Sequence, residues 1–168
     1  VAGGGGGPLH GALLAAELKV PEVLVPTAPG HFSALGMLMS DVRHDLVRTS
    51  LMGLEDADAP ARAGAIWADL EGEMLGSFEG ERIDATDVRL VRSADMRYLG
   101  QEHTVTVALP DGPLDAERRA EIRRRFDEAH ERLYTFRLDV PAEIVTFRLA
   151  GYGTVAKPPL RELEPVAG

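Results

Sequence analysis

Apolar residues in the first third of the chain recur at helical and then at strand spacings. Residues 9–18 predict a helix that opens at Pro8, because proline fixes the backbone torsion φ at a value suited to the first turn of a helix. Four further segments follow from composition and periodicity: a short buried strand over 22–26 between two prolines, a turn over 27–31, an apolar helix over 32–41 and an edge strand over 42–49.

The second half shows longer periodic stretches. Residues 61–78 predict a helix despite three interior glycines, because five large apolar side chains share one face: Ile66, Trp67, Leu70, Met74 and Phe78. Residues 87–109 predict a β-hairpin, since apolar positions alternate in both halves; the first half places on one face Val88, Leu90, Ala94, Met96 and Tyr98.

A long helix and a third strand complete the pattern. Residues 114–136 predict a helix whose inward stripe is Ile122, Phe126, Ala129 and Leu133. Its other face mixes five arginines with acidic residues, which we interpret as a solvated surface rather than an anion site. Residues 143–150 predict a strand that turns one face inward, formed by Val145, Phe147 and Leu149.

The order of these elements predicts an α/β to α+β fold in two parts. We expect residues 1–54 to form the first part, residues 55–157 an α+β domain, and residues 158–168 a proline-containing tail. The chain begins at Val1 and enters a glycine turn with no strand before it. We therefore expect it to be the C-terminal piece of a longer protein.

Composition narrows the classes of partner. The chain has 168 residues, 45% of them apolar, and its 27 acidic and 18 basic residues give a net charge of −9. No basic stripe is interleaved with aromatic residues, so neither nucleic acid nor a membrane surface is the expected partner. The absence of cysteine excludes disulfides, thiolate catalysis and cysteine-ligated metals. No apolar run approaches a membrane span, and we expect a cytoplasmic protein.

The most unusual stretch is the run of five glycines from Gly3 to Gly7, followed by Pro8. Glycines have no Cβ atom, so their N–H groups can approach an anion or a nucleobase closely. A glycine turn that opens a helix also presents the positive end of the helix dipole. These residues alone are equally compatible with a ligand-facing loop and with a disordered end of the chain.

Two standard phosphate-binding motifs are absent from this stretch. No Gly-Lys-Ser/Thr follows the glycines, so the chain lacks the lysine of a P-loop. The dinucleotide spacing G-x-G-x-x-G also fails, because the third glycine's place is taken by Pro8, Leu9 or His10.

The five histidines fall in five different predicted elements, and none forms a His-Glu-x-x-His motif. For His103 and His130 we favour a partly buried, hydrogen-bonded imidazole. His10 is a candidate ligand residue, because it follows the glycine loop. Asp41 and His44 lie in the Asp-Val-Arg-His-Asp cluster, which has the groups for acid–base or metal chemistry; an ion-pair network at a strand start is the more common outcome.

Several motifs together resemble the ATP-dependent hydantoinase A family, which includes N-methylhydantoinase, 5-oxoprolinase and acetone carboxylase subunits. The matching stretches run in order over most of the chain: Gly4 to His10, Ala28 to Gly36, Ser40 to Asp45, Asp95 to Gln101, Phe126 to Tyr134 and Glu143 to Val145. Gly3 stands where the family usually has an aromatic residue, and Gly6 where it usually has alanine.

The resemblance implies that this chain is the end of an actin-like ATPase core followed by a small domain of sheet and helices. It implies an adenosine site formed by Gly4, Gly5, Gly7 and Pro8, with ATP and Mg as the cofactor. It also implies a hydantoinase B-type partner subunit and a cyclic amide substrate, whose ring opening is coupled to ATP hydrolysis. No residue here matches the phosphate-binding loops or metal-binding acids of that fold, so the catalytic residues and any further metal stay unassigned.

Two alternatives to cyclic amide hydrolysis remain open at this stage. The sheet and helices of residues 87–149 are also compatible with a subunit-docking module, which a large exposed apolar patch on the hairpin would favour. A third interpretation keeps the family and changes the reaction to ATP-dependent ketone carboxylation. We further expect the chain to be inactive alone, and to self-associate through the apolar faces of its first two helices.

Overall fold

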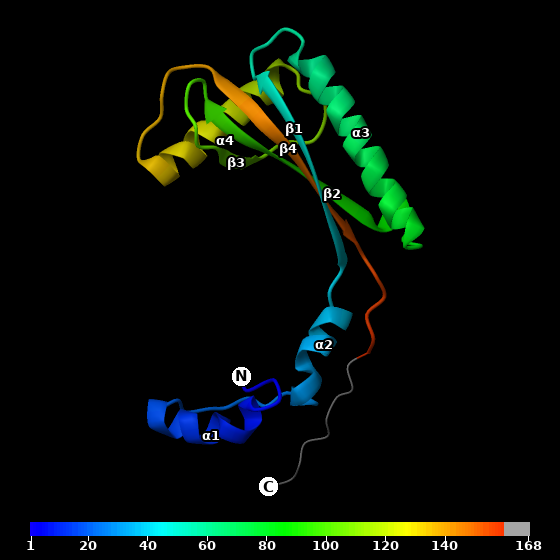
Figure 1. Ribbon diagram of the computed structural model, residues 1–168, viewed down its shortest axis with the longest axis vertical. Helices are drawn as coiled ribbons and strands as arrows, with labels where there is room; N and C mark the ends of the chain where they lie inside the picture. Colours follow the sequence, from blue (N-terminus) through cyan, green and yellow to red (C-terminus); the bar gives the residue numbers. More distant parts are fainter. Residues whose placement is uncertain (160–168) are drawn as a thin grey trace. The chain divides into compact units, whose positions relative to one another are not determined.

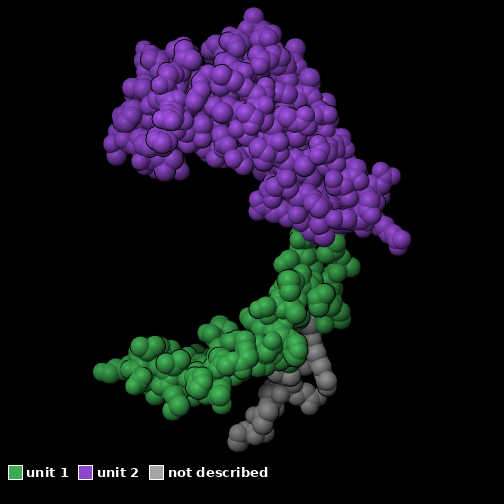
Figure 2. Space-filling view, in the orientation of Figure 1, with its two compact units in different colours: residues 1–41, 155–168 green, residues 42–154 purple. Residues whose placement is uncertain are grey.

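The computed structural model describes residues 1–159, and these form two compact units (Figure 2). The first comprises Val1–Asp41 and residues from Val155 onward; the second comprises Val42–Thr154. The predicted domain limits at residues 54 and 157 stay predictions, and residues 160–168 of the predicted tail lie outside the described part. The first unit contains α1 (Gly7–Leu18), the 3-10 turn η1 (Pro29–His31) and α2 (Phe32–Leu38) (Figure 1).

The second unit is built around one four-stranded sheet (Figure 1). Its elements follow in the order β1 (Val42–Gly53), α3 (Ala59–Gly80), the 3-10 turn η2 (Ala85–Asp87), β2 (Val88–Tyr98), β3 (Val105–Ala108), α4 (Ala116–Tyr134) and β4 (Ala142–Gly153). The strand order is β1-β4-β2-β3, with every neighbouring pair antiparallel. Each helix therefore connects two strands that have one other strand between them, as in a split βαβ arrangement. The predicted edge strand and hairpin are confirmed.

Both long helices cover the same face of the sheet. From α3, Trp67 meets Phe147 of β4 edge to face, with ring centroids 5.2 Å apart. From α4, Phe126 meets Tyr98 of β2 in the same way at 4.7 Å. Because Ala94 of β2 lies opposite Phe147 in the register, these contacts belong to one continuous core. Four of the five residues in the predicted α3 stripe are buried, and Ile66 packs against them.

Two glycines of β4 let α3 approach the sheet closely. A Cβ atom on Gly151 would lie 2.6 Å from Sδ of Met74 and 2.7 Å from a ring carbon of Phe78. Gly153 would place a Cβ atom 2.8 Å from the same ring. Because real Cβ atoms do not approach so closely, only glycine permits this seating of α3.

The inward face of β4 differs from the predicted one at its first position. Thr146 pairs with Asp95 and Ile144 with Met96, so Val145 is an extra residue in the β4 ladder. A bulge of this kind reverses the alternation of side chains. Ile144 is therefore the buried residue, together with Phe147 and Leu149, whereas Val145 is only partly buried.

The predicted stripe of α4 also needs one correction. Leu133 is 64% exposed, and the side chain buried at the end of the stripe is His130, at 1% exposure. Its Nδ1 lies 2.9 Å from the carbonyl oxygen of Phe136, and its Nε2 lies 3.1 Å from Oε1 of Gln101. The hydrogen-bonded imidazole expected for His130 is confirmed, whereas His103 is exposed and the expectation is wrong there.

Residues 22–26 do not form the predicted strand. The segment is extended, but a ladder needs a neighbouring strand, and none lies beside it in the described part of the first unit. Its carbonyl at Leu24 accepts one hydrogen bond, from the N–H of Ala2 at 2.8 Å. The side chain of Leu24 is 60% exposed rather than buried. The helix predicted over 32–41 is confirmed but ends at Leu38.

The face of the sheet opposite the helices holds a buried carboxylate, Asp95. Its Oδ1 accepts a hydrogen bond from the hydroxyl of Thr106 at 2.7 Å, and its Oδ2 accepts one from Nε of Arg148 at 2.8 Å. Burial raises the pKa of Asp95, but the two hydrogen bonds and the charge of Arg148 outweigh it, so the pKa lies below its ordinary value.

We predict that Gly151→Ala destabilises the chain by about 1–3 kcal/mol, because the new methyl group must displace Met74 and Phe78. Gly72→Ala is the control: a Cβ atom there meets nothing within 4 Å, and alanine gains about 1 kcal/mol over glycine inside a helix. Urea unfolding measures both. Equal stability of Gly151→Ala and the unmodified chain would contradict the close seating of α3.

We predict that Asp95→Asn costs about 1–2 kcal/mol at pH 7, a range that allows for screening because Arg148 is 45% exposed. A carboxyl whose pKa is lower in the folded state stabilises the fold above its unfolded pKa, and this contribution is lost as the pH falls through the folded pKa. The difference between the variant and the unmodified chain should therefore shrink below about pH 4. Urea unfolding at several pH values tests this.

The control for this experiment is Asp45→Asn, which breaks an exposed pair with Arg43 on the same face of the sheet. Exposed ion pairs contribute little to stability, so this variant should unfold almost like the unmodified chain at pH 7. A larger effect for Asp45→Asn than for Asp95→Asn would refute the assigned importance of the buried carboxylate.

Candidate functional site: the glycine loop

The glycine run forms a turn that leads into α1. Gly4 has φ +79°, a conformation that glycine adopts without strain, and its N–H donates to the carbonyl of Pro29 at 2.8 Å. The N–H of Ala2 donates to Leu24 on the other side of the loop. These two bonds connect the start of the glycine loop to the segment around Leu24 and to the 3-10 turn before α2.

The space beside the middle of the loop is open. Cβ atoms built on Gly5 and Gly6 meet nothing within 4 Å. By contrast, a Cβ atom on Gly3 would lie 3.3 Å from a ring carbon of Phe32, and one on Gly7 would lie 3.5 Å from the backbone of Ala2. The two ends of the loop therefore pack against other residues, whereas the space beside Gly5 and Gly6 is empty.

The N-terminus of α1 carries the electrostatic character expected for anion or nucleotide binding. Its N-cap, Gly6, supplies no side-chain hydrogen bond, and the first turn contains no acidic residue. The first N–H groups of a helix have no partner within the helix, and the dipole makes this end positive. The loop is thus suited to donate hydrogen bonds to a ligand from its backbone N–H groups alone.

No residue of α1 or α2 is buried in the described structure. The most exposed apolar side chains of the two helices are Leu9, Leu13, Leu18 and Met37. The apolar faces that we expected from the sequence are therefore present and uncovered, and the expected self-association stays a prediction.

The other candidate residues are engaged in ion pairs or lie on the surface. His10 is exposed on α1, and Asp41 pairs with Lys157. His44 lies on β1, where its Nε2 is 3.0 Å from Oε1 of Glu81. Arg43 and Asp45 form an ion pair at 2.8 Å, and the hydrogen bond from Arg43 is the main reason why the pKa of Asp45 is lowered. The cluster at the start of β1 is thus a set of ion pairs.

Within residues 1–159, no group of three or more histidine, aspartate or glutamate side chains is arranged to hold a metal ion. The structure gives no grouping that would join His10, Asp41 and His44 as ligands, and their role stays a prediction.

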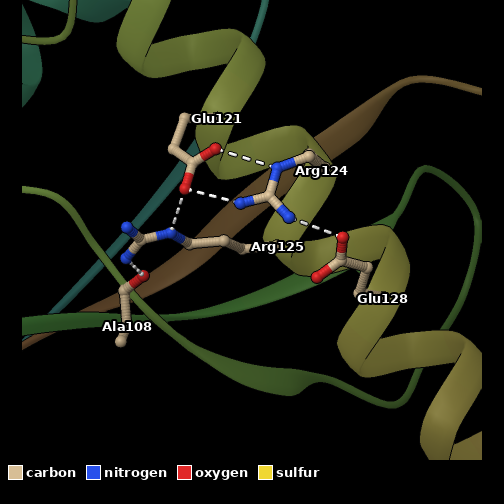
Figure 3. Close-up of polar contacts among 5 residues, drawn as sticks. All are labelled: Ala108, Glu121, Arg124, Arg125 and Glu128. Carbon is tan, nitrogen blue, oxygen red and sulfur yellow. Dashed lines mark hydrogen bonds and ion pairs between the residues drawn. The ribbon is translucent and has the colours of Figure 1, made fainter.

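Two arginines of α4, Arg124 and Arg125, pair with acidic neighbours on the same helix (Figure 3). Arg124 bridges Glu121 and Glu128, and Arg125 reaches both Glu121 and the carbonyl of Ala108. This agrees with a solvated charged surface and not with an anion site.

The second unit contains a cavity between α3, the loop after β3 and α4 that was not predicted from the sequence. A signal was present, however. Arg92 interrupts the otherwise apolar face of β2 between Leu90 and Ala94, and its guanidinium lies 5.1 Å from the centre of the Trp67 ring. A charged residue in a core-facing position requires either a partner or a function.

Comparison with known families identifies the class of this chain. Residues 1–46 match the hydantoinase/oxoprolinase family, and residues 54–164 match the hydantoinase/oxoprolinase C-terminal domain. The chain belongs to the hydantoinase/oxoprolinase family, of which it represents a C-terminal part. The resemblance predicted from the ordered motifs is thereby confirmed.

Two curated relatives align with nearly the whole chain. An uncharacterised protein of Methanocaldococcus jannaschii is 32% identical over 94% of this chain and 22% of its own length. The caprolactamase subunit alpha of Pseudomonas jessenii is 28% identical over 97% of this chain and 24% of its own length. The chain therefore spans about a quarter of the length of the relatives it matches.

Two solved structures share the fold. A nucleotide-free acetone carboxylase superposes with a TM-score of 0.84 at 23% identity, over 98% of this chain and 24% of the other. The ATP-dependent caprolactamase of Pseudomonas jessenii superposes with a TM-score of 0.75 at 25% identity, over 99% of this chain and 25% of the other. These matches confirm the predicted mixed fold class. No helix within residues 1–159 is long and apolar enough to cross a membrane.

Proposed function

We propose that this chain is the C-terminal part of an ATP-dependent hydantoinase/oxoprolinase-type subunit, in which a cyclic amide ring is opened at the expense of ATP. Family membership and the caprolactamase relative support this reaction class. The alternative of ketone carboxylation has less support, because the acetone carboxylase match is one of fold alone.

The glycine loop is the proposed nucleotide site, with Gly4, Gly5, Gly7 and Pro8 at the adenosine. The observation that carries this proposal is the clear space beside Gly5 and Gly6 at the uncapped start of α1. Backbone N–H groups can approach the adenosine there, since no side chain intervenes and no side chain caps the first turn of the helix. Mg would accompany ATP, and we assign no protein ligand to it.

Docking to a partner subunit is a second proposed role, specific to the second unit. The hairpin loop exposes Leu99, and the end of α4 and the segment after it expose Leu133 and Phe136. The N–H of Leu99 donates to the carbonyl of Pro141 at 2.9 Å, which ties the hairpin loop to the segment that follows α4. A B-type subunit is the proposed partner, and apolar residues of this kind are typical of such contacts.

We predict that ATP with Mg shifts the amide signals of residues 3–14 saturably in an NMR titration of the full chain. Gly5→Val should abolish these shifts, because its side chain fills the clear space without a clash in the free protein. Gly36→Val is the matched control: it lies on α2, where a Cβ atom also meets nothing within 4 Å. It should leave the titration unchanged.

Two results would refute the adenosine site. One is a folded chain whose loop signals do not move at saturating ATP. The other is an equal response in Gly5→Val and the unmodified chain, which would place the nucleotide elsewhere.

We predict that the chain by itself opens neither hydantoin nor 5-oxoproline when ATP and Mg are supplied. The resemblance assigns the phosphate-binding and metal-binding groups to other parts of the fold, and phosphoryl transfer depends on those groups. Chromatography measures the ring-opened product, and phosphate release is measured in parallel. Ring opening that requires ATP and disappears in Gly5→Val would contradict the prediction and would show that this chain holds catalytic groups.

A further inference from the structure

The cavity of the second unit has the size and lining of a small-molecule site. Its volume is about 310 Å³, near the lower end of the range for ligand pockets. Its floor is apolar, formed by Ile144 and Phe147 of the sheet, and Trp67 and Ile122 line its sides from the two helices. Such a pocket, apolar with a few polar groups at its rim, is the usual form of a binding site.

Two small residues on α3 border the cavity. Gly64 and Ala68 both line it, one on each side of Trp67 in the sequence. Gly64 is exposed, and a Cβ atom built on it meets nothing within 4 Å, so a larger side chain can be placed there without a clash. Glycine in the middle of a helix costs about 1 kcal/mol relative to alanine, and no contact in the folded chain requires it here.

Two arginines hold the loop that borders the cavity. Arg92 donates to the carbonyl of Gly112 at 3.3 Å, and Arg118 donates to the carbonyl of Asp111 at 2.7 Å. Gly112 has φ +101°, and a Cβ atom there would lie 2.8 Å from the guanidinium of Arg118. The loop is therefore fixed in place, and the rim is preformed.

The charges at the rim are already compensated. Nε of Arg92 donates to Oε1 of Glu71 at 2.8 Å, and Arg118 pairs with Asp115. An ionic ligand would thus have to give up water without meeting an unpaired counter-charge, which is unfavourable. A neutral ligand avoids this cost. A guanidinium has five N–H donors, and Arg92 uses three of them in hydrogen bonds to Glu71 and Gly112. The remaining N–H groups can donate to an acceptor atom of a ligand.

We propose that this cavity binds a compact neutral molecule, ring-shaped or branched and mainly apolar, with one polar oxygen directed at Arg92. The proposal goes beyond the nucleotide site: the cavity belongs wholly to the second unit, and no residue of the glycine loop lines it.

The test uses the fluorescence of Trp67, the single tryptophan of the chain, with cyclohexanol as the probe. Cyclohexanol should change this fluorescence saturably in the full chain, with a dissociation constant on the order of 1 mM, because so few atoms supply limited affinity. Cyclohexylammonium and cyclohexanecarboxylate carry the same ring with a charge and should each bind at least about tenfold more weakly.

Two variants on α3 form a matched pair. Gly64→Leu places a side chain in the open space of the cavity and should weaken cyclohexanol binding at least about tenfold. Gly72→Leu makes the same change on the same helix, also where a Cβ atom meets nothing within 4 Å, but outside the cavity lining. It should bind cyclohexanol like the unmodified chain. Both variants exchange glycine for a better helix former, so both should fold.

Three outcomes would overturn the proposal. The first is the absence of a saturable change with cyclohexanol in the folded chain. The second is equal binding by Gly64→Leu and Gly72→Leu, which would place the probe outside the cavity. The third is tighter binding of either ion than of cyclohexanol, which would refute a neutral ligand. None of these outcomes depends on ATP, so the nucleotide proposal succeeds or fails separately.

Discussion

The second unit depends on the pairing of β4 with two strands at once. Val42 of β1 and Val88 of β2 both lie opposite Gly153, and the two ladders continue along most of β4. The last strand in the chain order is therefore central in the sheet, which is incomplete until it is in place. It also carries Gly151 and Gly153, the positions against which α3 packs. Loss of this strand would separate β1 from the β2–β3 hairpin and would remove the surface against which α3 packs.

Periodicity identified most elements because their apolar faces are continuous. The stripe of α3 is continuous, and the apolar alternation of β2 is broken only at Arg92, so local pattern predicts both elements correctly. The bulge at Val145 was invisible, because one extra residue changes which side chains face inward without changing the composition. The strand order was also beyond local pattern, since it depends on contacts between distant residues.

The end of α4 shows a different limit. Leu133 fits the helical spacing, yet His130 takes the buried place, where its two ring nitrogens lie within hydrogen-bond distance of Gln101 and of the carbonyl of Phe136. A polar ring can be buried in a core when hydrogen-bond partners are available, and the partners of His130 come from two separate loops.

The strand predicted over residues 22–26 is absent for a related reason: the sequence suits a strand, but a strand also requires a neighbouring strand. For the glycine loop, the sequence identified the residues, and the structure adds the clear space beside Gly5 and Gly6.

The pair of Arg92 and Glu71 gives the strongest reason to regard the cavity as more than a packing defect. Partly buried ion pairs lose hydration on folding, and well-packed apolar residues in their place are often equally stable or more stable. If residue 92 served only to stabilise the fold, an apolar residue would be expected there, as at Leu90 and Ala94 on the same face of β2. The arginine instead joins α3 to the loop after β3, lies over the ring of Trp67 and lines the cavity. Such an arrangement orients a ligand, because the apolar walls accept any molecule of suitable size and the guanidinium fixes the position of its polar atom.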